Sequence, residues 1–402
     1  MKVTQAYTIL NSILKETLGE TAIQVEDLKD VVTLGRAYED IINNNAYDHY
    51  CGKLINHIGK VVFVDRVYEG SAPNVMMDGW EFGSIKEKIS CGLPESKENP
   101  TWKLQDGQSY DQNVFHAPPA VKAKFFNGKT TFQVDFSIAR EQVKESFSSA
   151  TQLNAFYTMI ENRIRMRLRI DFDNLIMRTI NNFTGAAIYS SFKSVTSADY
   201  AKDSKVRAVN LLKLYKDINP TATVSAENCI YDKDFLRFAA GHIGKYTDRI
   251  KNASKLFNLS GEVRFTNAEN QKLVLLSDFE KNCHSYLYGD TFHQDEVKLP
   301  AAETVSFWQG TDTDFGLGPI SEIDVNIQDV FNNSPTAGGL EIHAYGILGV
   351  LFDREALGVC NPSNRVTSNY NALAEFTNYY YKSDAEYFND YDENFVVFYV
   401  AE

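Results

Sequence analysis

The chain has 402 residues, an apolar fraction of 44% and a formal net charge of −13. This length suffices for roughly two or three compact lobes with real cores, and the 22 Tyr and 26 Phe exclude a disordered chain. Proteins that read DNA sequence need a basic face for phosphates, so the acidic balance argues against a transcription factor. It is compatible with a wall against which DNA packs non-specifically.

The five Cys are an odd number, widely scattered, and contain no CxxC pair. This usage is typical of reduced thiols in a cytoplasm and not of a disulfide framework. Near the N-terminus, Lys, Glu and Asn interrupt the apolar positions, so we expect no signal peptide there. No run along the chain is apolar enough to span a bilayer, and we expect no membrane association.

The first part of the chain shows helical spacing of apolar residues. The pattern predicts helices over about 3–18, 26–42 and 47–58, which we group as an N-terminal helical arm, residues 1–58. The β-branched run Val61 to Tyr68 then predicts a strand.

Residues 70–119 show no sustained period and contain several Pro and Gly. So long an irregular stretch is uncommon in a compact domain, and it is either a mobile lid or an arm that another copy of the chain covers. Trp80, Phe82 and Trp102 favour the arm, because a solvated lid would gain little from exposing them. We therefore expect these three aromatic residues to contact a neighbouring subunit.

A tight hairpin is predicted next, from Val121–Phe126 to Thr130–Ile138 across Asn127-Gly128, a dipeptide that favours the positive φ angles of such turns. The second strand alternates strictly between apolar and polar residues. Residues 59–140 are thus expected to form an extended loop and a β-hairpin.

The longest predicted helix covers Ser149 to Asn182, with apolar residues at steps of three and four along its whole length. At 1.5 Å per residue it would be about 50 Å long, more than a small domain needs. We interpret residues 141–195 as a spine helix with part of a peripheral domain.

Four Arg alternate along this helix, at positions 163, 165, 167 and 169. Steps of two place them on opposing sides of a helix, with Glu161, Asp171 and Asp173 in reach as partners. Ion pairs, or contacts of Arg163 and Arg167 with a neighbouring subunit, are favoured over DNA readout.

The second half of the chain alternates helices and strands. Helices are predicted from Asp203 to Ile218 and from Asp232 to Ala240, the latter capped by Asp232. The predicted strands are Glu262–Phe265, Lys272–Leu276, Leu340–Phe352 and Asn394–Val400. Gly310–Gly339 is rich in Gly and Asp and is predicted to form surface loops.

No catalytic constellation, metal-ligand spacing or cofactor motif is present. Gly128-Lys129-Thr130 lacks the earlier Gly of a phosphate-binding loop, because that position is Ala123. Seven dispersed His form no metal motif, and no GxSxG occurs. A glycosidase could use a pair of the carboxylates that gather near aromatics, but acidic surface loops explain them without any site and are favoured. These carboxylates are Asp312, Asp314, Asp384, Glu386, Asp390, Asp392 and Glu393.

The order of these parts resembles the major capsid proteins of tailed, podophage-like bacteriophages. HIGKVVFVDRVYEG (His57 to Gly70) looks like the start of their extended loop. GILGVLFDREALGVCNPSNRV and the segment ending in NFVVFYVAE look like their closing strands. The resemblance implies an α+β fold of HK-97 type, with N-terminal arm, extended loop, spine helix, peripheral domain and axial domain. Residues 196–402 would form the axial domain with returning peripheral strands.

The resemblance also implies a function. The protein would be a structural, non-enzymatic component of the virion that assembles in the host bacterial cytoplasm. It would form hexamers and pentamers of an icosahedral shell enclosing double-stranded DNA, without cofactors, and with scaffolding and portal proteins as partners. A bacterial nanocompartment shell protein of the same fold remains an alternative, as does a carbohydrate-active enzyme or sugar-binding module.

Overall fold

The computed structural model describes residues 72–77, 86–94, 96, 98, 105–107, 118–139, 150–193, 205–288, 300–309, 320–327, 339–374 and 376–402. These residues fall into two compact units, which we describe separately. The described part of the first unit comprises residues 131–139, 150–171, 363–374 and 376–383, and the second unit contains the remainder.

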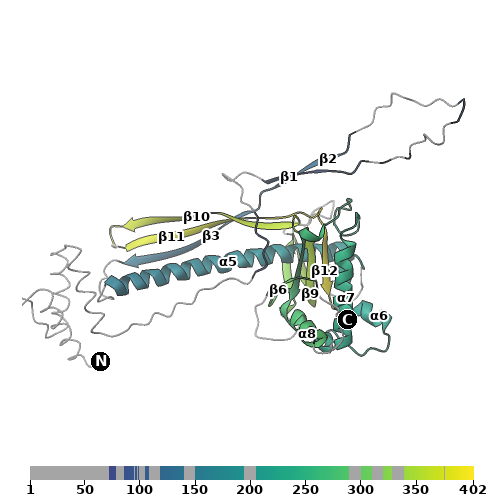
Figure 1. Ribbon diagram of the computed structural model, residues 1–402. Coiled ribbons are helices and arrows are strands. Elements are labelled where there is room, and N and C mark those ends of the chain that lie inside the picture. The colour runs from purple at the N-terminus through teal and green to yellow at the C-terminus, as the bar shows by residue number, and fades with distance from the viewer. Residues whose placement is uncertain are drawn as a thin grey trace, which may run out of the picture. The chain divides into compact units, whose positions relative to one another are not determined.

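The first unit is built on a three-stranded sheet of order β10-β11-β3, beside which the helix α5 runs (Figure 1). In β3, Phe132, Val134, Phe136 and Ile138 are half-buried and the residues between them are exposed, which confirms the predicted alternation. Phe136 stacks on Tyr379 at 5.2 Å and on Tyr381 at 5.7 Å between ring centroids. The elements are β3 (Lys129–Ala139), α5 (Ala150–Phe192), β10 (Leu357–Asn371) and β11 (Phe376–Asn389).

The helix α5 is longer than predicted, because it continues past Asn182 to Phe192. Its 43 residues span about 65 Å at 1.5 Å per residue. The extra turns lie in the second unit, where Phe183, Ala186, Ala187 and Ile188 are buried. Gly185 permits a close approach there, since a Cβ atom would lie 2.7 Å from Cγ2 of Val325. Tertiary packing thus overrides the low helix propensity of Gly.

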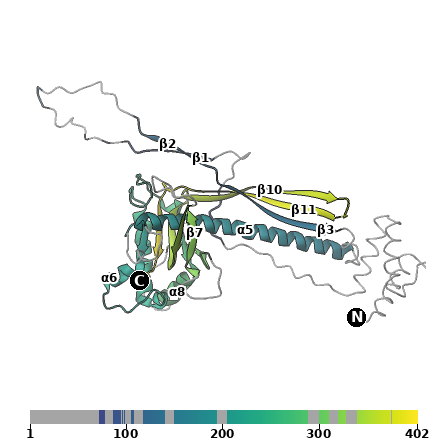
Figure 2. The ribbon, with the colours of Figure 1, turned by 180° about the vertical axis from the view of Figure 1, so that it is seen from behind.

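The core of the second unit is a five-stranded sheet of order β4-β12-β9-β5-β6, flanked by helices (Figure 2). Every residue of β9 and β12 is buried, as expected of central strands covered on both faces. Phe395 stacks on Phe183 at 4.2 Å between ring centroids. The strands are β4 (Ala208–Asn210), β5 (Gln271–Leu276), β6 (Glu303–Val305), β9 (Ile347–Asp353) and β12 (Phe395–Tyr399). The helices are α6 (Leu211–Ile218), α7 (Lys233–Arg249) and α8 (Ser277–Tyr288), with the 3-10 turns η4 (Cys229–Tyr231) and η5 (Ala268–Asn270).

Two of the predicted strands in this unit are confirmed as β5 and β12, and Asp232 caps α7 by accepting a hydrogen bond from the Phe235 amide at 2.7 Å. The helix predicted to start at Asp203 starts only at Leu211. Asn210 interrupts it, because its side chain accepts from the Lys213 amide at 3.1 Å and caps the helix there. β4 precedes that cap.

Three predictions for the second half are wrong. Glu262–Phe265 forms no strand but a single bridge between Arg264 and Ser254. Leu340–Phe352 is two strands, β8 (Leu340–Ala344) and β9, divided at Gly346 with φ of 71°. The stretch Gly310–Gly339 is not all loop, since Ile323–Ile327 forms β7 and pairs with β8.

The prediction of a hairpin across Asn127-Gly128 is also wrong. β2 (Val121–Phe126) pairs with β1 (Lys86–Cys91), and β3 belongs to a different sheet. Neither residue of the dipeptide has a positive φ angle. Gly128 is needed for close approach instead, because its carbonyl accepts from the Tyr387 amide at 3.0 Å and a Cβ atom would lie 2.4 Å from the Tyr387 oxygen.

β1 also corrects the expectation that residues 70–119 are irregular throughout.

The predicted helices within residues 1–58 and the strand Val61–Tyr68 lie outside the described residues. Among the helices that the structure does describe, none combines the length and hydrophobicity needed to cross a membrane.

Candidate functional site

β1 and β2 form a two-stranded antiparallel ribbon, which we call the ribbon (Figure 1). Lys88 lies directly opposite Lys124, and Cys91 lies opposite Val121. Residues along β1 alternate between half-buried and exposed. A lone two-stranded ribbon is marginally stable in water, so its half-buried face must be supported by the rest of the unit.

That support comes from the connection between β11 and β12, residues Asp390–Glu393, which we call the acidic turn. The Asp390 carboxylate pairs with Lys88 Nζ at 2.8 Å through Oδ2 and with Lys124 Nζ at 3.0 Å through Oδ1. Lys88 also pairs with Glu393 at 2.7 Å, and Lys124 pairs with Asp392. The Asp390 side chain is only 2% exposed, so solvent screens these pairs little.

The protonation equilibria of Asp390 and Lys88 favour their charged forms. Burial by itself raises the pKa of Asp390, but hydrogen bonds and attraction from Lys88 and Lys124 outweigh it and lower that pKa below the ordinary value. Burial likewise lowers the pKa of Lys88, yet its bonds to Asp390 and Glu393 raise the pKa overall. Both shifts indicate that the ion pairs more than offset the cost of removing the charges from water.

Backbone hydrogen bonds that involve no lysine also hold the acidic turn. The Asp390 amide donates to the Ala356 carbonyl at 2.7 Å, and the Leu259 amide donates to the Tyr391 carbonyl at 3.0 Å. The Asp392 amide donates to Oδ1 of Asp390 at 3.2 Å, which orients the carboxylate. The site is therefore a preorganised acceptor for cations carried by the ribbon.

Apolar contacts complete the support at the other end of the ribbon. Phe126 packs on Phe388 with ring centroids 5.1 Å apart, and Lys86 Nζ lies 3.9 Å from the centroid of the same ring. Burial lowers the pKa of Lys86. Lys129, just beyond the ribbon, pairs with buried Glu386 at 3.4 Å.

The opposite face of the ribbon is exposed and mainly apolar, with Glu87, the cross-strand partner of Phe125, as its charged side chain. Ile89, Val121 and Phe125 are each 65–66% exposed, and Leu93 just beyond β1 is 67% exposed. The ribbon therefore inverts the usual arrangement: Lys86, Lys88 and Lys124 lie on the half-buried face, while most of the apolar side chains, Phe126 excepted, are turned to solvent. Exposed apolar groups gathered in this way are typical of protein interaction sites.

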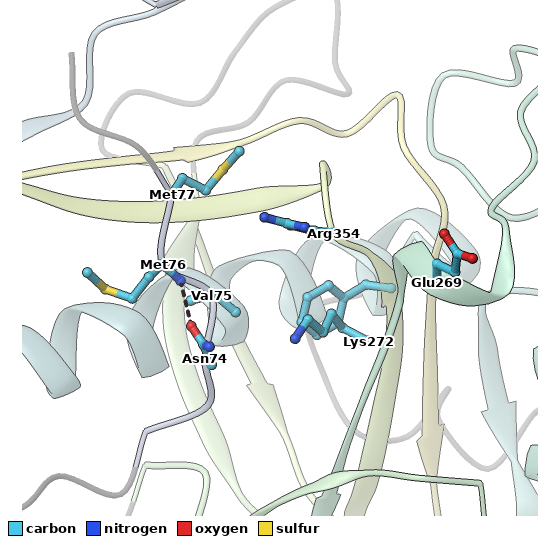
Figure 3. A pocket seen from close by; sticks show the side chains of 8 residues that line it. Asn74, Val75, Met76, Met77, Glu269, Lys272 and Arg354 are labelled. Carbon is cyan, nitrogen blue, oxygen red and sulfur yellow. Dashed lines mark hydrogen bonds between the residues drawn. The ribbon is translucent and has the colours of Figure 1, made fainter. Parts of the chain in front are cut away.

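A polar pocket lies where the segment before the ribbon crosses the second unit (Figure 3). The Met77 amide donates to the Val359 carbonyl at 3.1 Å, and the Val359 amide donates to the Val75 carbonyl at 3.2 Å. Glu303 accepts from the Asn74 amide at 2.5 Å and pairs with Lys272 at 3.3 Å. These polar groups hold residues 74–77 in place, and they include no nucleophile beside a base.

The other sequence candidates are divided between described and undescribed residues. Trp80, Phe82 and Trp102 lie outside the described residues, as do Asp312 and Asp314. Arg163 and Arg167 are exposed on α5, where Arg167 pairs with Asp171 at 3.0 Å. Arg165 pairs with Glu161 at 2.6 Å, so the predicted i,i+4 pairs are confirmed for these two arginines.

The prediction that the C-terminal carboxylates occupy surface loops is wrong for Glu386, Asp390, Asp392 and Glu393, which are buried. The sequence suggested surface loops or a glycosidase pair for these carboxylates and did not reveal their lysine partners. The available signal was the spacing of Lys86 and Lys88 in one segment and of Lys122 and Lys124 in another. Each spacing places two lysines on one face of a strand.

Other reactive side chains in the described part of the chain are inert or exposed. Burial raises the pKa of Cys229 and of Cys283 to about 12, so neither thiol is a nucleophile at neutral pH. Asp324, Glu341 and His343 gather on the exposed face of β7 and β8, where Asp324 and His343 are cross-strand neighbours 3.3 Å apart. Such exposed groups are ordinary surface pairs.

Solved structures share this arrangement of elements. A chain of the Staphylococcus phage Andhra capsid structure is 11% identical, with 85% of this chain and 87% of that chain covered and a TM-score of 0.53. A chain from the structure of the head fiber and inner core protein gp22 of native bacteriophage P68 is 8% identical, with coverage of 85% and 88% and a TM-score of 0.53. At this identity the likeness concerns the fold, which is the α+β capsid fold of HK-97 type.

The family model of the Phi29-like phage major capsid protein matches residues 10–399. The chain therefore belongs to the family of Phi29-like phage major capsid proteins, and it is a structural component of the phage head. A search among curated proteins found no match. The predictions of a capsid protein and of its fold are confirmed, and neither alternative function is favoured.

Proposed function

We propose that this capsid protein assembles into hexamers and pentamers of an icosahedral shell, and that the exposed face of the ribbon is one contact between neighbours. The observation that carries the proposal is the ribbon itself, which exposes Ile89, Val121 and Phe125 while buried ion pairs secure its other face. Burying apolar surface is the main driving force of association, and an ordinary interface removes about 1,600 Å² from water. Weak contacts repeated around a closed lattice become collectively strong.

The remaining contacts of this proposal lie farther along the extension and on α5. Trp80, Phe82 and Trp102 belong to the chain on either side of β1 and would add apolar surface to the same interface. Arg163 and Arg167 are exposed on α5 and would meet carboxylates of a neighbour. Charges at the rim of an interface chiefly set specificity and encounter rate.

We assign domain roles on the same basis. Residues 1–58 would form the N-terminal arm, 59–140 the extension, 141–195 the spine with part of the peripheral domain, and 196–402 the axial domain with returning strands. The three-stranded sheet of the first unit fits the peripheral role, and the five-stranded sheet of the second unit fits the axial role.

The proposed partners follow from the function of a head protein. Scaffolding and portal proteins would direct assembly in the host cytoplasm, and packaged double-stranded DNA would contact the shell without sequence specificity. The net charge of −13 supports weak contacts with phosphate. We propose a role without catalysis or cofactor, since the buried acidic residues that a glycosidase would need are engaged by lysines.

The exposed face can be tested by replacing Val121 and Phe125 with Ser in the full-length protein. Wild-type protein, produced with its scaffolding protein, is expected to form megadalton particles in sedimentation and negative-stain microscopy. The double variant is expected to remain a folded, unassembled subunit. Ile218→Ser, at a residue 62% exposed at the end of α6, controls for loss of any exposed apolar group.

Two outcomes would contradict the proposal. Normal particles from the double variant would show that this face is not a contact. A wild-type protein that stays a 45.5 kDa monomer under every condition, with or without scaffolding protein, would contradict shell assembly itself.

A further inference from the structure

The register of the ribbon places two like charges face to face. Lys88 on β1 is the direct cross-strand partner of Lys124 on β2, and both side chains point toward the half-buried side. Like charges in directly opposed positions destabilise a strand pair. The ribbon thus carries at its centre a repulsion that its own sequence does not relieve.

Asp390 relieves that repulsion by binding both strands at once. One carboxylate oxygen contacts Lys88 and the other contacts Lys124, at 2.8 and 3.0 Å. The two other carboxylates of the acidic turn each serve a single strand, Glu393 for Lys88 and Asp392 for Lys124. Among the ion pairs of the described residues, Asp390 alone joins β1 to β2.

We propose that Asp390 is a positioning residue that couples the pairing of β1 with β2 to the docking of the ribbon on the acidic turn. With Asp390 charged, pairing and docking reinforce each other, and the exposed apolar face is presented as one ordered surface. Without that charge, the two lysines repel each other and the ribbon separates. The consequence for assembly rests on the proposed function; the consequence for ribbon order does not.

The charges around Asp390 explain why the other carboxylates do not substitute for it. Arg264 lies 4.0 Å from Glu393, so the cluster holds three cations against the three anions of the acidic turn. Removal of Asp390 leaves three cations and two anions, with nothing between the opposed lysines. The two nearby carboxylates have other contacts. Glu262 pairs with Lys122 and with Arg264. Glu355 contacts Lys88 through its backbone carbonyl oxygen, at 3.3 Å.

Asp390→Asn is the decisive substitution, because it removes the charge and keeps the oxygen that accepts from the Asp392 amide. Hydrogen exchange followed by mass spectrometry on unassembled full-length protein would report on residues 86–91 and 121–126. Breaking a buried pair costs several kcal/mol, so we expect exchange in both strands to rise on the order of a hundredfold. Exchange in the five-stranded sheet should be unchanged.

Two further variants separate coupling from a general structural loss. Asp392→Asn removes a partner of Lys124 only, so β1 should keep its protection. In the double variant Asp390→Asn with Lys124→Met, the repulsion is gone and protection of the ribbon should return to within about tenfold of wild type. Shell formation should follow the same order, lost in the single variant and regained in the double variant.

Unchanged exchange of the ribbon in Asp390→Asn would overturn the inference, and so would failure of Lys124→Met to restore protection. These outcomes are read on unassembled protein, so they are distinct from failure of the proposed function. That failure would appear as wild-type protein with an ordered ribbon and no shells.

Discussion

Two of the sheets in the second unit, the five-stranded sheet and the ribbon, are built with opposite chemistry. In the five-stranded sheet, β12 buries every side chain, and Phe395 packs between aromatic neighbours with no exposed surface. In the ribbon, the inward side chains include Lys88 and Lys124, while Phe125 is 65% exposed. The comparison teaches that the five-stranded sheet buries its apolar side chains within the chain, whereas the ribbon is held by ion pairs and leaves apolar side chains exposed.

The largest effect is expected from substituting the same residue type, Phe, in the five-stranded sheet and in the ribbon. Phe395→Ala should lower the free energy of unfolding by about 3–5 kcal/mol, because it opens a cavity among close-packed rings. Phe125→Ala should leave the free energy of unfolding of the unassembled subunit within about 0.5 kcal/mol of wild type. Chemical denaturation followed by near-ultraviolet circular dichroism measures both; equal losses would contradict the contrast.

The second test concerns the passage from the ribbon into β3. Gly128→Val should cost about 1–3 kcal/mol, because its side chain would collide with the Tyr387 backbone and displace Phe126 from Phe388. Thermal denaturation measures the loss. Asn127→Ala, at the exposed neighbour, is the matched control and should change little. A larger effect of Asn127 than of Gly128 would revive the turn interpretation.

The third test uses pH. The folded-state pKa of Asp390 is lowered, so its contribution to ribbon stability is complete above the unfolded value of about 3.9 and is lost as pH falls through the lower folded value. Hydrogen exchange of the ribbon, corrected for intrinsic rates, should therefore be constant from pH 7 to about pH 5. Loss of protection near pH 6 would show that another group controls the ribbon.

The smallest expected effect is at the rim of the ribbon. Lys122 pairs with Glu262, but its side chain is 58% exposed, and solvent screens such pairs. Lys122→Met should leave both the denaturation midpoint and the ribbon's exchange rates unchanged within error. A loss comparable to that of Asp390→Asn would mean that total positive charge, and not the buried carboxylate, secures the ribbon.

The sequence predicts those elements whose apolar pattern matches their burial. The stripe of α5 predicts its buried side chains Ile164, Phe172, Leu175 and Ile176, and the apolar runs of β5 and β12 predict central strands. The end of α5 is not predictable in the same way, because it depends on Gly185 meeting β7. The residue at which α5 ends is therefore decided by contacts between residues far apart in the sequence.

The ribbon and its contacts with the acidic turn could not be predicted from the sequence, for a physical reason. β1 turns Lys86, Lys88 and Ser90 inward, so it lacks the hydrophobic alternation by which a strand is recognised. The Asn127-Gly128 signal is local, and the contact of Gly128 with Tyr387 overrides it. The acidic turn looked solvated because its partners lie about 300 positions earlier, as the separation of 305 between Lys88 and Glu393 shows.

A single carboxylate shared by two lysines also constrains how the family can diverge. A neutral substitution at position 390 is tolerable only if position 88 or 124 loses its charge as well, since the opposed lysines otherwise remain uncompensated. Among homologous sequences, these three positions should therefore co-vary as a set despite their separation along the gene. Position 392, which serves one strand, should drift more freely.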